Sequence, residues 1–150
     1  MKYIYLLLIL FIGFSSCAKR KARKQAEKDE DIIVQYIADH NLAAIPTGTG
    51  LYYVIDSQGT GPSCTSNSTV VAYYKGYFTD GITFDESPIS GIEFPLQNVI
   101  EGWKEGIPYF KEGGVGKLLI PSALGYGPNG NSGIPPNSVL IFDIGLIDVL

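Results

Sequence analysis

The chain begins with an unbroken apolar run of eleven residues, Ile4 to Phe14, between a short cationic start and Ser15-Ser16-Cys17. As a helix rising about 1.5 Å per residue, this run would span about 17 Å, whereas the hydrocarbon core of a bilayer is about 30 Å thick. The run is therefore too short for a stable transmembrane span. Its position and flanks are typical of a secretory signal sequence.

Apolar residues recur at helical spacing in the next periodic segment, 29–42, at Ile32, Ile33, Tyr36 and Ile37. Acidic residues at its start and Asn41 near its end are typical of helix boundaries. The pattern predicts one helix of three or four turns, which either docks on the domain or acts as a spacer. The preceding segment, 18–28, is polar and charged and is expected to be an exposed tether.

From residue 45 onward the chain consists of short apolar runs separated by glycine, proline, asparagine and aspartate, which is typical of strands and tight turns. The predicted strands cover residues 51–55, 69–78, 82–84, 92–96, 116–121 and 139–150. The second and third of them are expected to form a hairpin through Thr79-Asp80-Gly81.

The segment Asn98–Pro108 predicts a short amphipathic helix around the single tryptophan. Asn98 would be its N-cap, and Glu101 could reach back to the amide of the cap. One face of this helix carries Val99, Ile100, Trp103 and Ile107. A helix of about eight residues is not stable alone in water, so the rest of the chain must cover that face. Trp103 is then either a core residue or the floor of a binding pocket.

A loop of sixteen residues, Ser122 to Asn137, carries four glycines and three prolines. Loops of this length in a small domain are usually functional. The loop also holds two large side chains, Tyr126 and Ile134, which we expect on a flexible rim.

Composition limits the chain of 150 residues, 45% of them hydrophobic, to one compact domain. The net charge of −4 hides an asymmetry, because six basic residues lie within 19–28, whereas four lysines face fourteen acids from Asp29 onward. This acidic body argues against nucleic acid as a partner. The basic run suits an anionic lipid surface, although a solvated linker explains it as well.

Cysteine and histidine are too sparse for metal or triad chemistry. The chain has two cysteines, Cys17 and Cys64, and one histidine, His40. There is no Cys-x-x-Cys motif, and the two cysteines are not expected to form a disulfide. We therefore expect no metal and no cofactor, and His40 is most simply a solvated residue at a helix end.

The small residues before Cys17 resemble the lipobox of bacterial lipoproteins, whose cysteine is acylated and becomes the mature N-terminus. Phe14 and Ser16 depart from the commonest residues of that pattern. The alternative is an ordinary cleaved signal with an incidental cysteine. The chain is thus predicted to comprise a signal peptide, 1–16, a tether with the N-terminal helix, 17–44, and a folded domain, 45–150.

Several short motifs follow one another in residues 49–150. They are Tyr-Lys-Gly (74–76), Asp-Gly-x-x-Phe-Asp (80–85), Phe-Pro-Leu (94–96), Val-Ile-x-Gly-Trp-x-Glu-Gly (99–106), Gly-Tyr-Gly (125–127), Ile-Pro-Pro-Asn (134–137) and Leu-Ile-Phe-Asp (140–143). In this order they resemble the FK506-binding-protein (FKBP) type of peptidyl-prolyl cis/trans isomerase. The order of all seven makes the resemblance specific, whereas any single motif would be weak.

The resemblance implies an α+β fold, with a twisted antiparallel β-sheet of about five strands wrapped over one short α-helix and preceded by an N-terminal helix. It also implies an apolar pocket with Trp103 as its floor. In that family the walls come from the positions of Tyr74, Phe84, Phe94, Val99 and Phe142, and the rim from those of Tyr126 and Ile134. Asp85 stands beside the wall, and the amide of Ile100 meets a ligand carbonyl.

Prolyl isomerisation suits such a site, because rotation about an X-Pro bond breaks no bond and needs no nucleophile. The barrier of about 18 to 20 kcal/mol comes from amide resonance. The planar amide is more polar than the twisted one, so a dry pocket disfavours the ground state. Within the catalytic set, Tyr126 is assigned as hydrogen-bond donor and Asp85 as orienting group, alongside Trp103, Phe84 and Phe142. The substrate-binding set is Tyr74, Phe94, Val99, Ile100 and Ile134.

The sequence thus predicts a prolyl isomerase that assists the folding of exported proteins, anchored through Cys17 in a bacterial cell envelope and facing the periplasm or exterior. The alternative is a non-catalytic, chaperone-like module that holds Pro-containing segments in the same pocket. Expected partners are Pro-containing polypeptides, macrolides of the FK506 type and a membrane. We expect a monomer.

Overall fold

The computed structural model describes the backbone of residues 2–150 and the side chains from residue 17 onward. The first element is one continuous helix, α1 (Lys2–Asp39), of 38 residues. The predicted helix, 29–42, is therefore part of a longer helix that includes the segment 18–28, whose side chains are mostly exposed as expected. Lysine, arginine, alanine and glutamate are strong helix formers, so the charged segment extends the helix. The helix ends before Asn41, whose φ of 51° is the left-handed conformation common after helix ends.

The predicted signal run, 4–14, lies outside the residues whose side chains the structure describes. Among residues 2–150, no helix is both long enough and apolar enough to cross a membrane.

The remaining chain forms one antiparallel sheet of seven strands in the order β1-β2-β6-β7-β3-β4, with β5 paired to β3. Its strands are β1 (Ile45–Pro46), β2 (Tyr52–Ser57), β3 (Thr69–Tyr77), β4 (Thr83–Glu86), β5 (Ile92–Pro95), β6 (Val115–Ile120) and β7 (Leu140–Val149). The predicted α+β fold is confirmed, but the sheet has seven strands, one more than the six predicted from the sequence pattern and more than the five or so that the family resemblance implied. The additional β1 is a two-residue edge strand, too short to leave a period in the sequence.

The tryptophan helix, α2 (Glu101–Gly106), is shorter than predicted and begins later. Asn98 ends a separate 3₁₀ turn, η1 (Leu96–Asn98), so it is not the N-cap. That position belongs to Ile100, whose backbone is extended and whose side chain forms no cap hydrogen bond. Val99 is extended as well, with φ −102° and ψ 176°. β-branched side chains favour this conformation. A second 3₁₀ turn, η2 (Ile107–Tyr109), follows α2.

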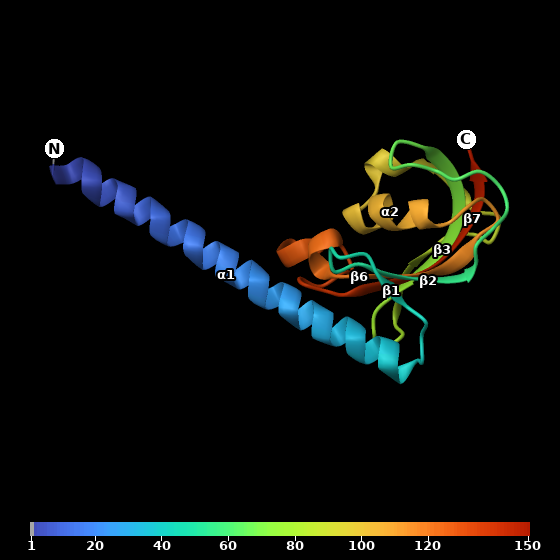
Figure 1. The fold of residues 1–150 in the computed structure, drawn as a ribbon, viewed down its shortest axis with the longest axis horizontal. Coiled ribbons are helices and arrows are strands. Elements are labelled where there is room, and N and C mark those ends of the chain that lie inside the picture. Colours follow the sequence, from blue (N-terminus) through green and yellow to red (C-terminus); the bar gives the residue numbers. More distant parts are fainter. Residues whose placement is uncertain (1) are drawn as a thin grey trace.

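The two helices cover opposite faces of the sheet (Figure 1), and each face has its own apolar core. On the α2 face the core consists of Leu51, Cys64, Val70, Ala72, Leu96, Trp103, Ile107, Phe110, Leu118, Ile120, Ile134, Leu140, Phe142, Ile144 and Leu146. On the α1 face it consists of Ile33, Tyr36, Val54, Leu119, Val139 and Ile141. Neighbours such as Leu118 and Leu119 fall in different cores because side chains alternate along a strand. The second half of α1 therefore docks on the sheet.

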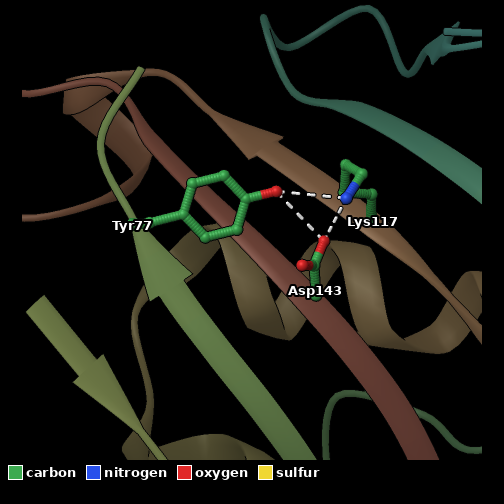
Figure 2. Close-up of polar contacts among 3 residues, drawn as sticks. All are labelled: Tyr77, Lys117 and Asp143. Atoms are coloured by element: carbon green, nitrogen blue, oxygen red, sulfur yellow. Dashed lines mark hydrogen bonds and ion pairs between the residues drawn. The ribbon is translucent and has the colours of Figure 1, made fainter. Parts of the chain in front are cut away.

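Polar contacts also join three adjacent strands within the sheet. Figure 2 shows Tyr77, Lys117 and Asp143 meeting on three adjacent strands: the Tyr77 hydroxyl donates to Asp143 Oδ1 at 3.1 Å, and Lys117 Nζ donates to the Tyr77 oxygen at 3.1 Å. Lys117 also forms an ion pair with Asp143. Burial and the charge of Asp143 raise the pKa of Tyr77 above its usual value. The Tyr77 side chain also packs against the core beneath α1.

Candidate active site

A cavity of about 450 Å³ opens on the α2 side of the sheet. Its size lies within the usual range of small-molecule sites, about 300 to 1,000 Å³. The lining side chains come from β3, β4, β5, β7, α2 and the connecting segments. They are Tyr74, Phe84, Asp85, Ile92, Phe94, Asn98, Val99, Ile100, Trp103, Tyr126 and Phe142.

The floor of the cavity is Trp103, which is 6% exposed. Two glycines let α2 approach β6 closely: a Cβ at Gly102 would lie 2.5 Å from Ile120 Cγ2, and one at Gly106 would lie 2.6 Å from Leu118 Cδ1. Larger residues would push the helix away from the sheet. These contacts give the Gly-Trp-x-Glu-Gly motif a physical reason, since the glycines face β6 while Trp103 faces the cavity.

The walls are aromatic, and their rings pack edge to face or, between Phe94 and Trp103, at a tilt. The Trp103 ring lies 4.9 Å from that of Tyr74 at 78°, and 5.1 Å from that of Phe142 at 82°. Phe84 meets Phe142 at 5.5 Å and 86°, and Phe94 meets Trp103 at 5.3 Å and 47°. Such pairs are favourable because the positive ring edge faces a negative ring face. Each wall residue is thereby held in place by its neighbours.

Glycine also shapes the wall at β3. A Cβ at Gly76 would lie 2.7 Å from the rings of both Phe84 and Phe142. The absent side chain at this position lets the two rings meet over the strand. The Tyr-Lys-Gly motif therefore ends in glycine for a packing reason.

Few polar groups face the cavity. The Tyr74 hydroxyl donates to Asp85 Oδ2 at 2.8 Å. Burial is the larger cause and the bond to the carboxylate the smaller one, and together they raise the pKa of Tyr74 to about 12. Asp85, predicted to be an orienting group, thus holds the Tyr74 hydroxyl. The Tyr126 hydroxyl has no hydrogen-bond partner among the side chains described, residues 17–150, and is available to a ligand.

A backbone donor lies at the start of α2. The carbonyl of Ile100 accepts from Trp103 and Lys104 at 3.0 and 3.2 Å, which makes Ile100 the first residue of the helical hydrogen-bond pattern. The first amides of any helix lack intrahelical acceptors. The amide of Ile100 is therefore available at the edge of the cavity, where a ligand carbonyl was expected.

Nine of the ten residues predicted for the site line this cavity, and Ile134 does not. Ile134 is 7% exposed and packs in the main core, and its expected role in substrate binding stays a prediction. Its backbone pairs with Asn131 across a short turn, and an isoleucine beside a core is more stable buried than facing water.

Two lining residues were missed, Ile92 and Asn98. Ile92 could have been found from the sequence, because it lies two residues before Phe94 in the same strand and so shares its face. Asn98 could not, since its cap-like spacing indicated a different role.

The geometry defines a class of protein: a small α+β domain with an aromatic cavity at which, among the described residues, the Tyr126 hydroxyl and the Ile100 amide are available to a ligand. A family model described as FKBP-type peptidyl-prolyl cis-trans isomerase matches residues 61–147. The chain belongs to this family, and the resemblance found in the sequence is confirmed.

The relatives include the isomerase FkpA of Escherichia coli K12, 47% identical over 105 residues that make up 69% of this chain and 39% of that protein. A crystal structure of FkpA from Escherichia coli superposes with a TM-score of 0.71 at 38% identity, covering 91% of this chain and 68% of that one. A peptidyl-prolyl cis-trans isomerase from Pseudomonas syringae superposes with a TM-score of 0.75 at 29% identity, covering 85% and 94%. The chain thus spans about two fifths of the curated FkpA it matches.

Proposed function

We propose that this protein catalyses cis/trans isomerisation of X-Pro bonds and acts as a folding catalyst for exported proteins. The observation that carries the proposal is the preformed cavity over Trp103, walled by aromatic rings and supplied with two unpartnered donors. A proline ring is apolar and matches such walls, while the carbonyl before it needs a donor.

The residues of this chain would act by binding the twisted bond more tightly than the planar one. Trp103 and the wall rings exclude water from the planar amide, whose larger dipole loses more solvation than that of the twisted form. The Ile100 amide holds a substrate carbonyl, and Tyr126 donates to a carbonyl as the bond rotates. Donors already in place lower the barrier without reorganisation.

The competing function is a non-catalytic module that holds Pro-containing segments. An isomerisation assay on a proline peptide, using purified residues 17–150, separates the two. We expect catalysis that is lost on addition of a macrolide of the FK506 type. A rate equal to the uncatalysed one, with the macrolide still bound, would establish the binding module instead.

We further propose that Cys17 is the acylated N-terminus of a lipoprotein in a bacterial cell envelope, with the domain facing the periplasm or exterior. Cys17 is exposed on α1 and is not in a disulfide. Several acyl chains would hold the protein firmly, since each buried CH₂ contributes about 0.8 kcal/mol. The basic residues that follow would add a salt-sensitive attraction to anionic lipid.

Metabolic labelling with a fatty-acid analogue tests the anchor, and the chain has its own control. Cys64 is buried, and burial raises the pKa of its thiol, so it is a poor substrate for modification. We expect label on wild type and on Cys64→Ser, and none on Cys17→Ser, which should also leave the membrane fraction. Unlabelled wild type would mean an ordinary signal peptide and a soluble product.

A further inference from the structure

Asp29 of α1 is a fully buried carboxylate, 0% exposed. Its Oδ2 accepts hydrogen bonds from the amide of Ser122 at 2.8 Å and from the hydroxyl of the same residue at 2.5 Å. Its Oδ1 accepts from Gln25 Nε2 at 2.6 Å. A buried carboxylate is costly unless it is well paired, and hydrogen bonds to charged acceptors are stronger than neutral ones. This contact therefore fixes Ser122 firmly to α1.

Ser122 begins the segment that ends at Tyr126. It starts a 3₁₀ turn, η3 (Ser122–Leu124), and its carbonyl accepts from the amide of Gly125 at 3.1 Å. Tyr126 follows directly and reaches the cavity. Only three residues thus lie between Ser122, which contacts the carboxylate, and Tyr126, so a shift of Ser122 is expected to displace the Tyr126 hydroxyl.

Among the described residues, the hydrogen bonds between α1 and the loop Ser122–Asn137, called the rim loop below, are those of Asp29 with Ser122. A cavity of about 470 Å³ lies between the helix and the loop, lined on the loop side by Ser122, Ala123, Gly127, Pro128 and Asn137. Beyond Tyr126 the loop contains glycines in the left-handed region, Gly127 at φ 62° and Gly130 at φ 65°. The polar attachment of this loop to the helix is therefore made at Asp29.

We propose that Asp29 is a positioning residue for the isomerase site: through Ser122 it holds the rim loop and sets the place of the Tyr126 hydroxyl. α1 lies outside residues 61–147, which match the family model. In this proposal α1 affects activity indirectly, because its Asp29 fixes the loop that carries Tyr126. The kinetic part of this inference rests on the proposed isomerase function.

The competing account is that Asp29 merely docks α1, and the neighbouring residue supplies a matched control. Glu30 accepts a hydrogen bond from the Tyr52 hydroxyl of β2. Tyr52→Phe removes an α1-to-sheet contact in the same helical turn without touching the rim loop. Asp29→Asn is the conservative variant, because its carbonyl oxygen can still accept from Ser122.

The experiment compares the full chain with Asp29→Ala, Asp29→Asn and Tyr52→Phe, each below its melting temperature. Amide hydrogen exchange of residues 122–130 reports the order of the loop, and kcat/KM on a proline peptide reports the site. Because small misplacements of a catalytic group cost up to about a hundredfold, we expect Asp29→Ala to speed exchange and lower kcat/KM by about tenfold each. Asp29→Asn should be intermediate, and Tyr52→Phe should change neither by more than about twofold.

Equal losses in Asp29→Ala and Tyr52→Phe would overturn the proposal, as would unchanged exchange or unchanged kcat/KM in Asp29→Ala. If wild type has no activity, the proposed function fails separately. Loop exchange and affinity for an FK506-type macrolide then decide the role of Asp29. Faster exchange and weaker macrolide binding in Asp29→Ala alone support the positioning role, and equal changes in Tyr52→Phe refute it.

Discussion

Trp103 and Tyr126 face the same cavity with very different burial. Trp103 is 6% exposed and belongs to the main core, whereas Tyr126 is partly buried and packs against the edge of that core. Trp103 Nε1 is buried without a hydrogen-bond partner among the residues described, so the ring contributes to stability through packing. The two residues should therefore separate stability from function.

Trp103→Ala should lower the free energy of unfolding by about 3 to 5 kcal/mol, as truncation of a buried aromatic does, and abolish activity. Tyr126→Phe removes one oxygen that has no partner and should leave Tm nearly unchanged while lowering kcat/KM. Thermal unfolding and the peptide assay measure both effects. A Tyr126→Phe protein that melts far below wild type, with full activity per folded molecule, would make Tyr126 a core residue.

Tyr74 should make stability depend on pH at the alkaline end. Its pKa is raised from 10.0 to about 12 in the folded protein, by burial and by the bond to Asp85. Between these two pH values the folded state keeps a proton that the unfolded chain loses. The contribution of Tyr74 to the free energy of unfolding is therefore fully present below pH 10 and is lost as pH rises from about 10 to about 12.

Urea unfolding at a series of pH values tests this dependence. The free energy of unfolding should fall more steeply above pH 10 in wild type than in Tyr74→Phe, which lacks the titrating group. Tyr52, whose pKa the bond to Glu30 and burial also raise to about 12, is present in both proteins and cancels. Parallel curves would show that Tyr74 titrates alike in the folded and unfolded states.

At the scale of elements, α2 has six residues and is far too short to form alone. Its stability comes from the sheet, which it approaches through Gly102 and Gly106. Alanine normally favours a helix by about 1 kcal/mol over glycine. In this helix the sign should reverse, because the added Cβ overlaps β6.

Gly102→Ala should destabilise the protein by about 1 to 2 kcal/mol, since overpacking usually costs about 1 to 3 kcal/mol. It should also weaken macrolide binding by moving Trp103. Glu101→Ala is the control, because the adjacent side chain is exposed and its pair with Lys104 is a surface contact of little energy. Chemical denaturation and ligand titration measure both. A stabilised Gly102→Ala protein would mean that helix propensity outweighs the contact.

At the scale of the whole molecule, the sheet is covered on both faces, and α1 supplies one cover. Ile33 and Tyr36 pack over Val54, Leu119 and Ile141. The segment that precedes the strands is therefore part of the folded unit, in addition to any role as a tether.

Deletion of residues 1–44 should expose that second core. Burying a large aliphatic side chain contributes about 1.5 to 3 kcal/mol, so partial exposure of several should cost on the order of 5 kcal/mol. We expect a lower Tm and binding of a hydrophobic dye by residues 45–150. Deletion of residues 1–16 alone is the control and should leave Tm unchanged. Equal Tm for the two truncated proteins would show that α1 does not pack on the sheet in solution.

The sequence by itself determined the elements whose signals are local. Strand positions follow from alternating burial and from glycine and proline in the turns, and these signals lie within a few residues of what they specify. Motifs such as Gly-Trp-x-Glu-Gly and Phe-Asp identified the family and most of the cavity, because their residues face one site from adjacent elements. Ile92 was within reach of the same reasoning.

Only the tertiary structure decided the features that depend on distant partners. Asn98 has the sequence spacing of an N-cap, but the helix begins later because the backbone of Val99 and Ile100 is extended. Ile134 packs in the core, which its position in a loop does not indicate. Asp29, one charge in a polar segment, is buried only because Ser122 lies opposite, 93 residues away. Local patterns carry no information on such pairings, since burial and hydrogen bonding depend on which surfaces the completed fold brings together.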